Sequence, residues 1–272
     1  MYSPARLAII LCALCAPATA LAQPMEGGAR IAALGGAGVA LPGDAWSRSN
    51  PAARGSLHGP TVAFFASQGY GMAELRFGAA TVAVPTGLGT LALGAQTFGF
   101  EEYRENVFSA GVARGFGIWN ARRLYGGIDV QLFQVQIPDY GSAHALALSL
   151  GLLAQVLPDL WVGMAARGLS TRKPSLNLPL DRTFALGFLY EPDARLRLLA
   201  DAGREIGAPF SFRSGVELSP VEAVAFRAGI STAPTLFSVG AGIRTGILAA
   251  DVAAQRHEVL GWTPGLSVEV AW

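Results

Sequence analysis

The chain has 272 residues, of which 51% are hydrophobic and only 14% are charged, and its mean hydropathy is +0.39. This composition is too apolar for an ordinary soluble domain. The formal net charge of +1 lacks the basic excess of a nucleic-acid-binding protein, so no nucleic-acid partner is expected. Past the N-terminus no stretch approaches the ~20 uninterrupted apolar residues of a transmembrane helix.

Residues 1–22 are predicted to be a secretory signal peptide. Arg6 supplies a positive charge, residues 7–15 form an apolar run, and Ala20-Leu21-Ala22 is a cleavage site of the A-x-A type. Both cysteines, Cys12 and Cys15, lie in this segment. The mature chain can therefore form no disulfide.

Residues 23–55 form a second unit, because they are the one part of the mature chain that is not predicted to be strand and turn. The sequence Gly35-Gly36-Ala37-Gly38 is similar to a phosphate-binding glycine loop. Such a loop needs a preceding strand and a following helix in a βαβ unit. Neither is predicted, so we expect no nucleotide and no other organic cofactor.

Residues 56–272 alternate between strand-like runs and turns rich in Gly, Pro, Asp and Ser, which is typical of an all-β fold. The period of two is clearest at the C-terminus, where Leu266, Val268, Val270 and Trp272 alternate with small or polar residues. The predicted strands are about 60–68, 72–84, 88–99, 104–115, 122–137, 143–156, 160–169, 181–190, 194–203, 209–218, 222–231, 235–244, 246–256 and 265–272.

This count of about fourteen is even, as in single-chain bacterial barrels. A change of parity in the fifth run predicts a β-bulge near Leu132. The second, sixth, eighth and tenth connections are predicted to be short, and the seventh (170–180) and thirteenth (257–264) to be the longest. Interfacial aromatic girdles are predicted from Trp119, Tyr125, Trp161, Tyr190, Trp262 and Trp272.

The less apolar face of these strands is rich in Gly, Ala and Ser, as expected of a narrow lumen, and the strand length suits a tilted membrane-spanning strand. A sheet exposed to lipid must close on itself, because each unpaired backbone group costs several kcal/mol in hydrocarbon. We therefore predict an all-β, about fourteen-stranded antiparallel transmembrane β-barrel in the bacterial outer membrane. A soluble sandwich is the alternative.

Charged residues occur on the predicted lumen face of the later strands, where they avoid the lipid: Arg197, Asp201, Arg213, Glu217, Arg227, Arg244, Asp251 and Glu269. One interpretation is an ion-paired network that fills and stiffens the lumen. The other is a polar conduit or a surface on which a plug docks.

Metal binding and hydrolysis are both poorly supported. His58, His144 and His257 lie in or beside different connections, and no cysteine accompanies them, so no metal site is expected. Ser142 lies near His144, but no acid stands out to orient the histidine. We expect no enzymatic activity.

The sequence from Arg30 to Leu41, with Asp44 and Asn50-Pro51-Ala52, resembles the N-terminal region of the FadL-like outer-membrane barrel superfamily, and most of all its PorV/PorQ-type branch. Residues 226–230, 237–243, 251–253 and 260–268 resemble the closing strands of that branch, and Trp272 resembles the C-terminal sorting signal of outer-membrane barrels. The residues that carry the resemblance of the N-terminal segment are Gly35, Gly36, Ala37, Asp44, Asn50, Pro51 and Ala52.

The resemblance implies a fourteen-stranded barrel with the N-terminal segment folded into the lumen as a plug. It implies passive passage of small hydrophobic molecules, gated by this plug, or a non-conducting barrel that docks secreted or envelope proteins. The expected partners are outer-membrane lipid, the barrel-assembly machinery, and either a hydrophobic small molecule or a secreted protein. The chain is much shorter than the fatty-acid transporters, so no substrate-contacting residue carries over.

Overall fold

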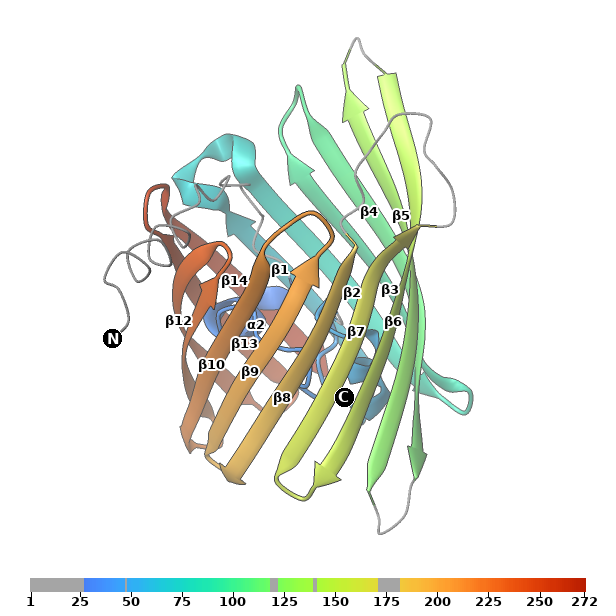
Figure 1. Cartoon of the computed structure of the whole chain (residues 1–272), viewed down its shortest axis with the longest axis vertical. Coiled ribbons are helices and arrows are strands. Elements are labelled where there is room, and N and C mark those ends of the chain that lie inside the picture. The colour runs from blue at the N-terminus through green and yellow to red at the C-terminus, as the bar shows by residue number, and fades with distance from the viewer. Residues whose placement is uncertain (1–26, 47, 118–121, 139–140, 171–181) are drawn as a thin grey trace, which may run out of the picture.

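A computed structural model describes residues 27–46, 48–117, 122–138, 141–170 and 182–272. They form one closed barrel of fourteen antiparallel strands, in which each strand pairs with its neighbours in sequence and β1 pairs with β14 (Figure 1). The predicted fold class and strand number are confirmed. The predicted signal peptide lies outside the described residues.

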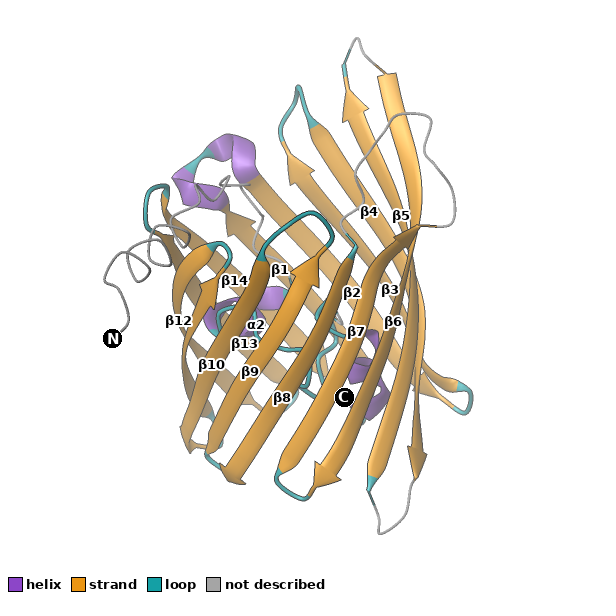
Figure 2. Ribbon diagram, viewed as in Figure 1, coloured by secondary structure: helices purple, strands orange, loops and turns teal. Residues whose placement is uncertain are grey.

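The strands are β1 (Thr61–Gln68), β2 (Arg76–Thr86), β3 (Gly89–Gly99), β4 (Arg104–Gly117), β5 (Arg123–Ile137), β6 (Gly141–Leu157), β7 (Leu160–Ser170), β8 (Thr183–Asp193), β9 (Leu196–Glu205), β10 (Phe210–Val221), β11 (Val224–Thr232), β12 (Thr235–Thr245), β13 (Leu248–His257) and β14 (Gly261–Ala271). The helical elements of the described residues are α2 (Gly28–Ala33) and the 3₁₀ helices η1 (Pro51–Ser56), η2 (Gly69–Gly71) and η3 (Ala73–Leu75) (Figure 2).

Side chains alternate between the outside and the inside of the barrel. On β12, Phe237 and Val239 are exposed on the outside, whereas Ser238 and Gly242 are buried inside. Exposed large apolar side chains occur on every strand of the described chain. An apolar exterior of this kind is typical of a barrel that faces lipid.

Barrel closure also joins the first strand to the last. Thr61 pairs with Ala271, and the backbone N–H of Trp272 donates to the carbonyl of Pro60 at 3.1 Å. In the described part of the chain, each of the fourteen strands thus has a neighbour on both sides. The side chain of Trp272 is exposed beside this junction.

The predicted β-bulge near Leu132 is wrong, because β5 keeps one register with both β4 and β6 along its length. The change of parity has another cause. Phe133 pairs with the buried residues Val107 and Ala145, so it is an apolar side chain that points into the lumen. The described register shifts lie instead between β6 and β7, β8 and β9, and β10 and β11.

The second, sixth, eighth and tenth connections are short, as predicted, but the thirteenth is short as well because β14 begins at Gly261. Residues 171–181 of the seventh connection lie outside the described residues. Pro264 is tolerated within β14 because β1 pairs with β14 only from Gly265 onward, so on that side no partner requires its missing N–H. Residues 69–75, with η2 and η3, form a longer loop than predicted.

Two members of the predicted aromatic girdles are not at the membrane interface. Tyr125 and Trp161 are buried inside the barrel and stack with ring centroids 6.2 Å apart. They have the parity of Gly127 and Gly163, which also face inward. Trp262 and Tyr190 are exposed on the outside, and Trp119 lies outside the described residues.

Candidate functional site within the barrel

The N-terminal segment, which we define as residues 27–57, lies inside the barrel (Figure 1). Its first element, α2, contacts β11 to β14 and β1, and its last, η1, contacts β3 to β6. The two ends of the segment therefore rest against opposite walls. In the described part of the chain, no helix is both long and apolar enough to cross a membrane.

The glycine pair Gly35-Gly36 ends α2. Gly36 N–H donates to the Ile31 carbonyl at 2.9 Å and Gly35 N–H to the Ala32 carbonyl at 3.2 Å, with positive φ angles of 79° and 70° at the two glycines. This is the Schellman arrangement, which favours glycine in the left-handed conformation. This helix lies before the glycines and was not predicted from the sequence, in which only a helix after them was sought.

Asn50 and Pro51 begin η1 and fasten it to the barrel wall. The Asn50 side chain accepts from the Ala52 N–H at 3.0 Å, which caps the helix, while Pro51 occupies the first turn. The Asn50 amide also donates to the carbonyls of Val39 and Leu152, at 2.7 and 2.8 Å. Asn50 is fully buried, so this one side chain joins two parts of the segment to β6.

Glycines of the inner wall let the backbone of the segment approach closely. A Cβ at Gly127 would collide with the backbone of Pro51 and Ala52, and a Cβ at Gly215 would lie 2.7 Å from the Leu34 carbonyl. Six such glycines form three cross-strand pairs: Gly127 with Gly151, Gly163 with Gly187, and Gly215 with Gly229. Inward glycines in the middle of strands were a sequence signal for close backbone approach, and the sequence reasoning did not use it.

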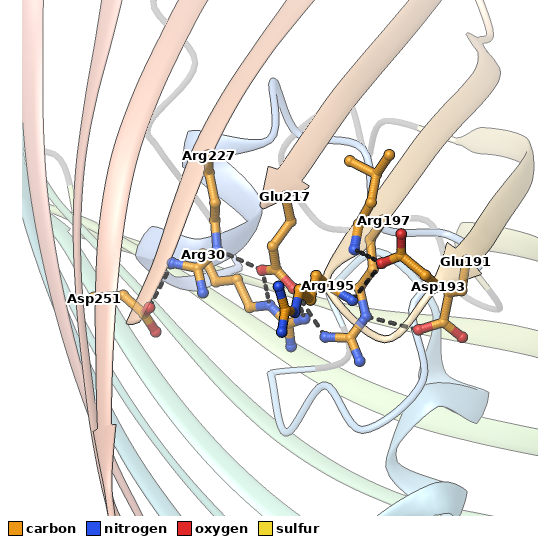
Figure 3. A network of polar contacts seen from close by, with 9 residues as sticks. Arg30, Glu191, Asp193, Arg195, Arg197, Glu217, Arg227 and Asp251 are labelled. Carbon is orange, nitrogen blue, oxygen red and sulfur yellow. Dashed lines mark hydrogen bonds and ion pairs between the residues drawn. The ribbon is translucent and has the colours of Figure 1, made fainter. Parts of the chain in front are cut away.

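Glu217 on β10 joins α2 to the wall through a cluster of arginines (Figure 3). Its carboxylate, 2% exposed, accepts two hydrogen bonds from Arg30, at 2.7 and 2.8 Å. Arg197 donates to the same carboxylate at 2.9 Å and Arg227 at 2.5 Å. Arg227 also donates to Asp251 at 2.6 Å. One carboxylate therefore accepts hydrogen bonds from three guanidinium groups, which belong to three different elements.

The η1 end has a simpler ion pair. Arg54 donates two hydrogen bonds to Asp129 on β5, at 2.8 and 3.0 Å, and both side chains are 4% exposed. Between the two ends, Asp201 on β9 accepts from the backbone N–H groups of Gly38 and Val39, at 2.7 and 3.0 Å. The sequence reasoning included Asp201 among the lumen charges but omitted Arg54 and Asp129.

The remaining predicted lumen charges also have inward parity. The Arg213 side chain approaches Gly36. Arg244 and Glu269 lie toward the end of the barrel that carries the short connections, on β12 and β14. Arg244 is exposed there and Glu269 is partly buried. These three residues lie around the segment but outside the cluster centred on Glu217.

Asp44 lies between the two anchored ends and is buried. Burial raises the pKa of Asp44 to about 6, and the negative charge of Glu269 acts in the same direction. The backbone N–H of Trp46, which donates to the Asp44 carboxylate at 3.3 Å, and the charges of Arg30 and Arg54 oppose this shift. Asp44 is therefore a titratable group inside the barrel whose charge interacts with those of Arg30 and Arg54.

Apolar side chains line the lumen on the side of β1 to β6. Phe65 on β1 and Phe77 on β2 pack together with ring centroids 5.7 Å apart, and Trp46 of the segment packs against Phe65 at 6.2 Å. Val107 and Phe133 continue this lining on β4 and β5. The lumen thus has an apolar wall on one side and the charged cluster on the other.

Metal ligation and hydrolysis are the other chemistries that the sequence raises. No group of three or more metal-ligating side chains occurs among the described residues. Ser142 and His144 belong to the outward face of β6, and the residues opposite them in the register with β5 are Gln136 and Gln134. The prediction of a protein without a catalytic site remains untested.

No protein-family model and no curated protein matches the chain. The fold is similar to that of a Pseudomonas aeruginosa FadL homologue, with a TM-score of 0.60 and 13% identity over 92% of this chain and 99% of that chain. It is also similar to the CymD monoaromatic hydrocarbon channel, with a TM-score of 0.67 and 13% identity over 93% and 99% of the two chains. The Pseudomonas putida toluene transporter TodX gives a TM-score of 0.62 and 11% identity over 92% and 99%. At such identities the likeness concerns the fold.

Proposed function

We propose that this protein is a passive outer-membrane channel for small hydrophobic molecules and that its N-terminal segment is a plug that gates the lumen. The observation that carries the proposal is the position of the segment, which crosses the barrel between opposite walls. The similar barrels named above include channels for aromatic hydrocarbons. The apolar exterior suits a lipid bilayer.

The chemistry of the lumen favours a hydrophobic solute. A molecule that enters from the end with the longer loops meets aromatic and aliphatic side chains on β1 to β6, among them Phe65, Phe77 and Phe133. Transfer of an apolar solute from water to such a wall is favourable, at roughly 25 cal/mol per Å² of apolar area. A charged solute would lose its hydration there without gaining compensating hydrogen bonds.

The segment is held against the wall by side-chain contacts and is not a strand of the sheet, as a movable gate requires. Its contacts with the strands are hydrogen bonds, ion pairs and van der Waals contacts from side chains such as Arg30, Asn50 and Arg54. The strands pair with one another around the full circumference. The barrel can therefore persist when the segment leaves its position.

The test is uptake of a hydrophobic fluorescent probe into vesicles that contain either the intact protein or a variant lacking residues 24–50. Gating by the segment predicts faster uptake with the deletion variant, because the lumen is then clear. A charged probe of similar size is the solute control, and migration in SDS gels before and after boiling checks that each barrel is folded.

Equal uptake by both forms, at the rate of empty vesicles, would overturn the channel proposal. If an envelope or secreted protein also co-purified with the intact barrel and not with the deletion variant, the competing function would gain support. That function is a docking barrel of the PorV type, which conducts nothing.

A further inference from the structure

The outward face of the barrel changes character toward the end that carries the longer loops. We define the outer polar patch as six residues on β2, β4, β5 and β6: Arg76, Arg104, Gln134, Gln136, Ser142 and His144. Arg104 pairs with Gln136 and Gln136 with Ser142, so three of them form one row across three strands. Gln134 and His144 form part of the next row. The hairpin of β5 and β6 reaches beyond its neighbours at the top of Figure 1.

The lipid-facing belt begins directly below this patch. The next outward row on β4, β5 and β6 consists of Phe108, Leu132 and Leu146, which are paired with one another and are 49%, 39% and 42% exposed. Consecutive outward rows are about 7 Å apart along a strand. The outward face therefore changes from amide, hydroxyl and imidazole groups to apolar side chains within one row. A lipid leaflet changes in the same order, from headgroups to acyl chains.

Two arginines face outward across a glycine in the same region. Gly99 on β3 pairs with Arg104 on β4, and the register of β2 with β3 ends at Phe77 and Phe98, which places Arg76 on β2 beside Gly99. Two strand spacings separate Arg76 from Arg104, or about 10 Å. Both arginines are exposed, and the glycine between them contributes no side chain. Guanidinium groups bind phosphate oxygens in pairs of hydrogen bonds.

An open cleft of about 810 Å³ is lined by Arg104 together with Glu101, Gln136 and Ser142. Amides and hydroxyls of this kind exchange hydrogen bonds with sugar hydroxyls. Glu101 and Arg104 both line this cleft, and the Glu101 carboxylate disfavours an anion within it. The phosphate is therefore placed on the other side of Arg104, at the gap over Gly99. The chemistry thus divides into an anion-binding side and a hydroxyl-binding side above an apolar row.

We propose that the outer polar patch binds the phosphorylated sugar headgroup of an outer-leaflet glycolipid, whose acyl chains lie along Phe108, Leu132 and Leu146. The phosphate binds between Arg76 and Arg104, and the sugar lies over Gln136 and Ser142. This inference rests on the proposed function in one respect, since it requires the barrel to reside in the outer membrane.

The test is retention of lipid A, measured by native mass spectrometry of the full protein in detergent. The double variant Arg76→Gln/Arg104→Gln is expected to bind lipid A about tenfold more weakly, as two partly exposed ion pairs are lost. Arg114→Gln is the matched control, because Arg114 also faces outward on β4 but lies near the opposite end, beside Phe116. Dephosphorylated lipid A should bind the wild type as weakly as lipid A binds the double variant.

Equal retention of lipid A by the wild type and the double variant would overturn the proposal, and so would equal binding of the two lipids by the wild type. Displacement of lipid A by millimolar inorganic phosphate alone would show a site for free phosphate instead. Probe uptake is measured on the same samples. Loss of the proposed function would show as absent uptake with glycolipid retention intact, so the two failures are distinguishable.

Discussion

At the η1 end of the N-terminal segment, Arg54 donates two hydrogen bonds to Asp129, and both side chains are 4% exposed. At the α2 end, Arg30 donates two hydrogen bonds to Glu217, but Arg30 is 22% exposed and Glu217 also accepts from Arg197 and Arg227. When Arg30 leaves, Glu217 keeps two guanidinium partners. When Arg54 leaves, Asp129 loses a bidentate partner in a buried position.

Ion pairs of similar geometry can therefore differ in the free energy that is lost when they break. Breaking a buried pair is expensive because a charge remains in a medium of low dielectric constant. Breaking a partly exposed pair whose acceptor has other partners costs far less. We therefore expect the α2 end to release first and the η1 end to remain as the anchor.

The largest effect is expected for Arg54→Met, which removes the guanidinium and leaves the Asp129 charge buried. Loss of one partner of a buried pair costs about 3–5 kcal/mol. We expect the N-terminal segment to become susceptible to protease while the barrel keeps its heat-dependent migration in SDS gels. The double variant Arg54→Met/Asp129→Leu should recover much of the protection, and a double variant no better than the single one would contradict the role assigned to the pair.

The next largest effect on stability is expected at Asp44, whose charge interacts with those of Arg30 and Arg54. This effect depends on pH. The pKa of Asp44 is about 6 in the folded protein, against 3.8 for the unperturbed group. The folded state therefore binds the Asp44 proton more tightly than the unfolded state does. Ionisation of Asp44 destabilises the folded state as pH rises from about 4 to 6. Two pKa units correspond to roughly 3 kcal/mol as an upper limit.

The measurement for Asp44 is the midpoint of thermal unfolding in detergent for the wild type and Asp44→Asn. The variant should gain stability over the wild type as pH rises through this window, and the gain should be constant above about pH 7. Below pH 4 the two proteins should unfold alike. A difference that does not change with pH would count against titration of Asp44.

Gly127→Ala probes the contact of η1 with the wall, and Gly126→Ala is its matched control. A Cβ at Gly127 would collide with Pro51 and Ala52, whereas a Cβ at Gly126 would be 3.9 Å from the nearest atom, in the Leu152 side chain. Overpacking typically costs about 1–3 kcal/mol. We expect faster probe uptake and easier proteolysis of the segment for Gly127→Ala alone; equal behaviour of the two variants would refute the proposed close docking.

The smallest effect is expected for Arg30→Gln, which removes one of the three guanidinium groups at Glu217. We expect a loss of about 1 kcal/mol in docking of α2. Hydrogen exchange should increase over residues 28–36 and stay unchanged over 50–56. Exchange that increases equally at both ends would show that the segment moves as one unit, and it would contradict the expected release of the α2 end before the η1 end.

Much of the fold follows from local patterns in the sequence. The period of two in runs such as 265–272 identified strands and their apolar faces, and the small residues on the other face together with the strand length indicated a membrane barrel. The errors arose where parity was not followed strictly. Tyr125 was assigned to a lipid interface although its parity is that of Gly127, and Phe133 was attributed to a bulge although an apolar side chain can also point into the lumen.

The sequence by itself determined the number of strands and the alternation of their faces, because both depend on residues close together in the chain. Only the tertiary structure decided which inward residues meet. Arg30 and Glu217 are 187 residues apart, and Arg54 and Asp129 are 75 apart. Their contacts depend on barrel closure and on the path of the N-terminal segment across it, which no local pattern encodes.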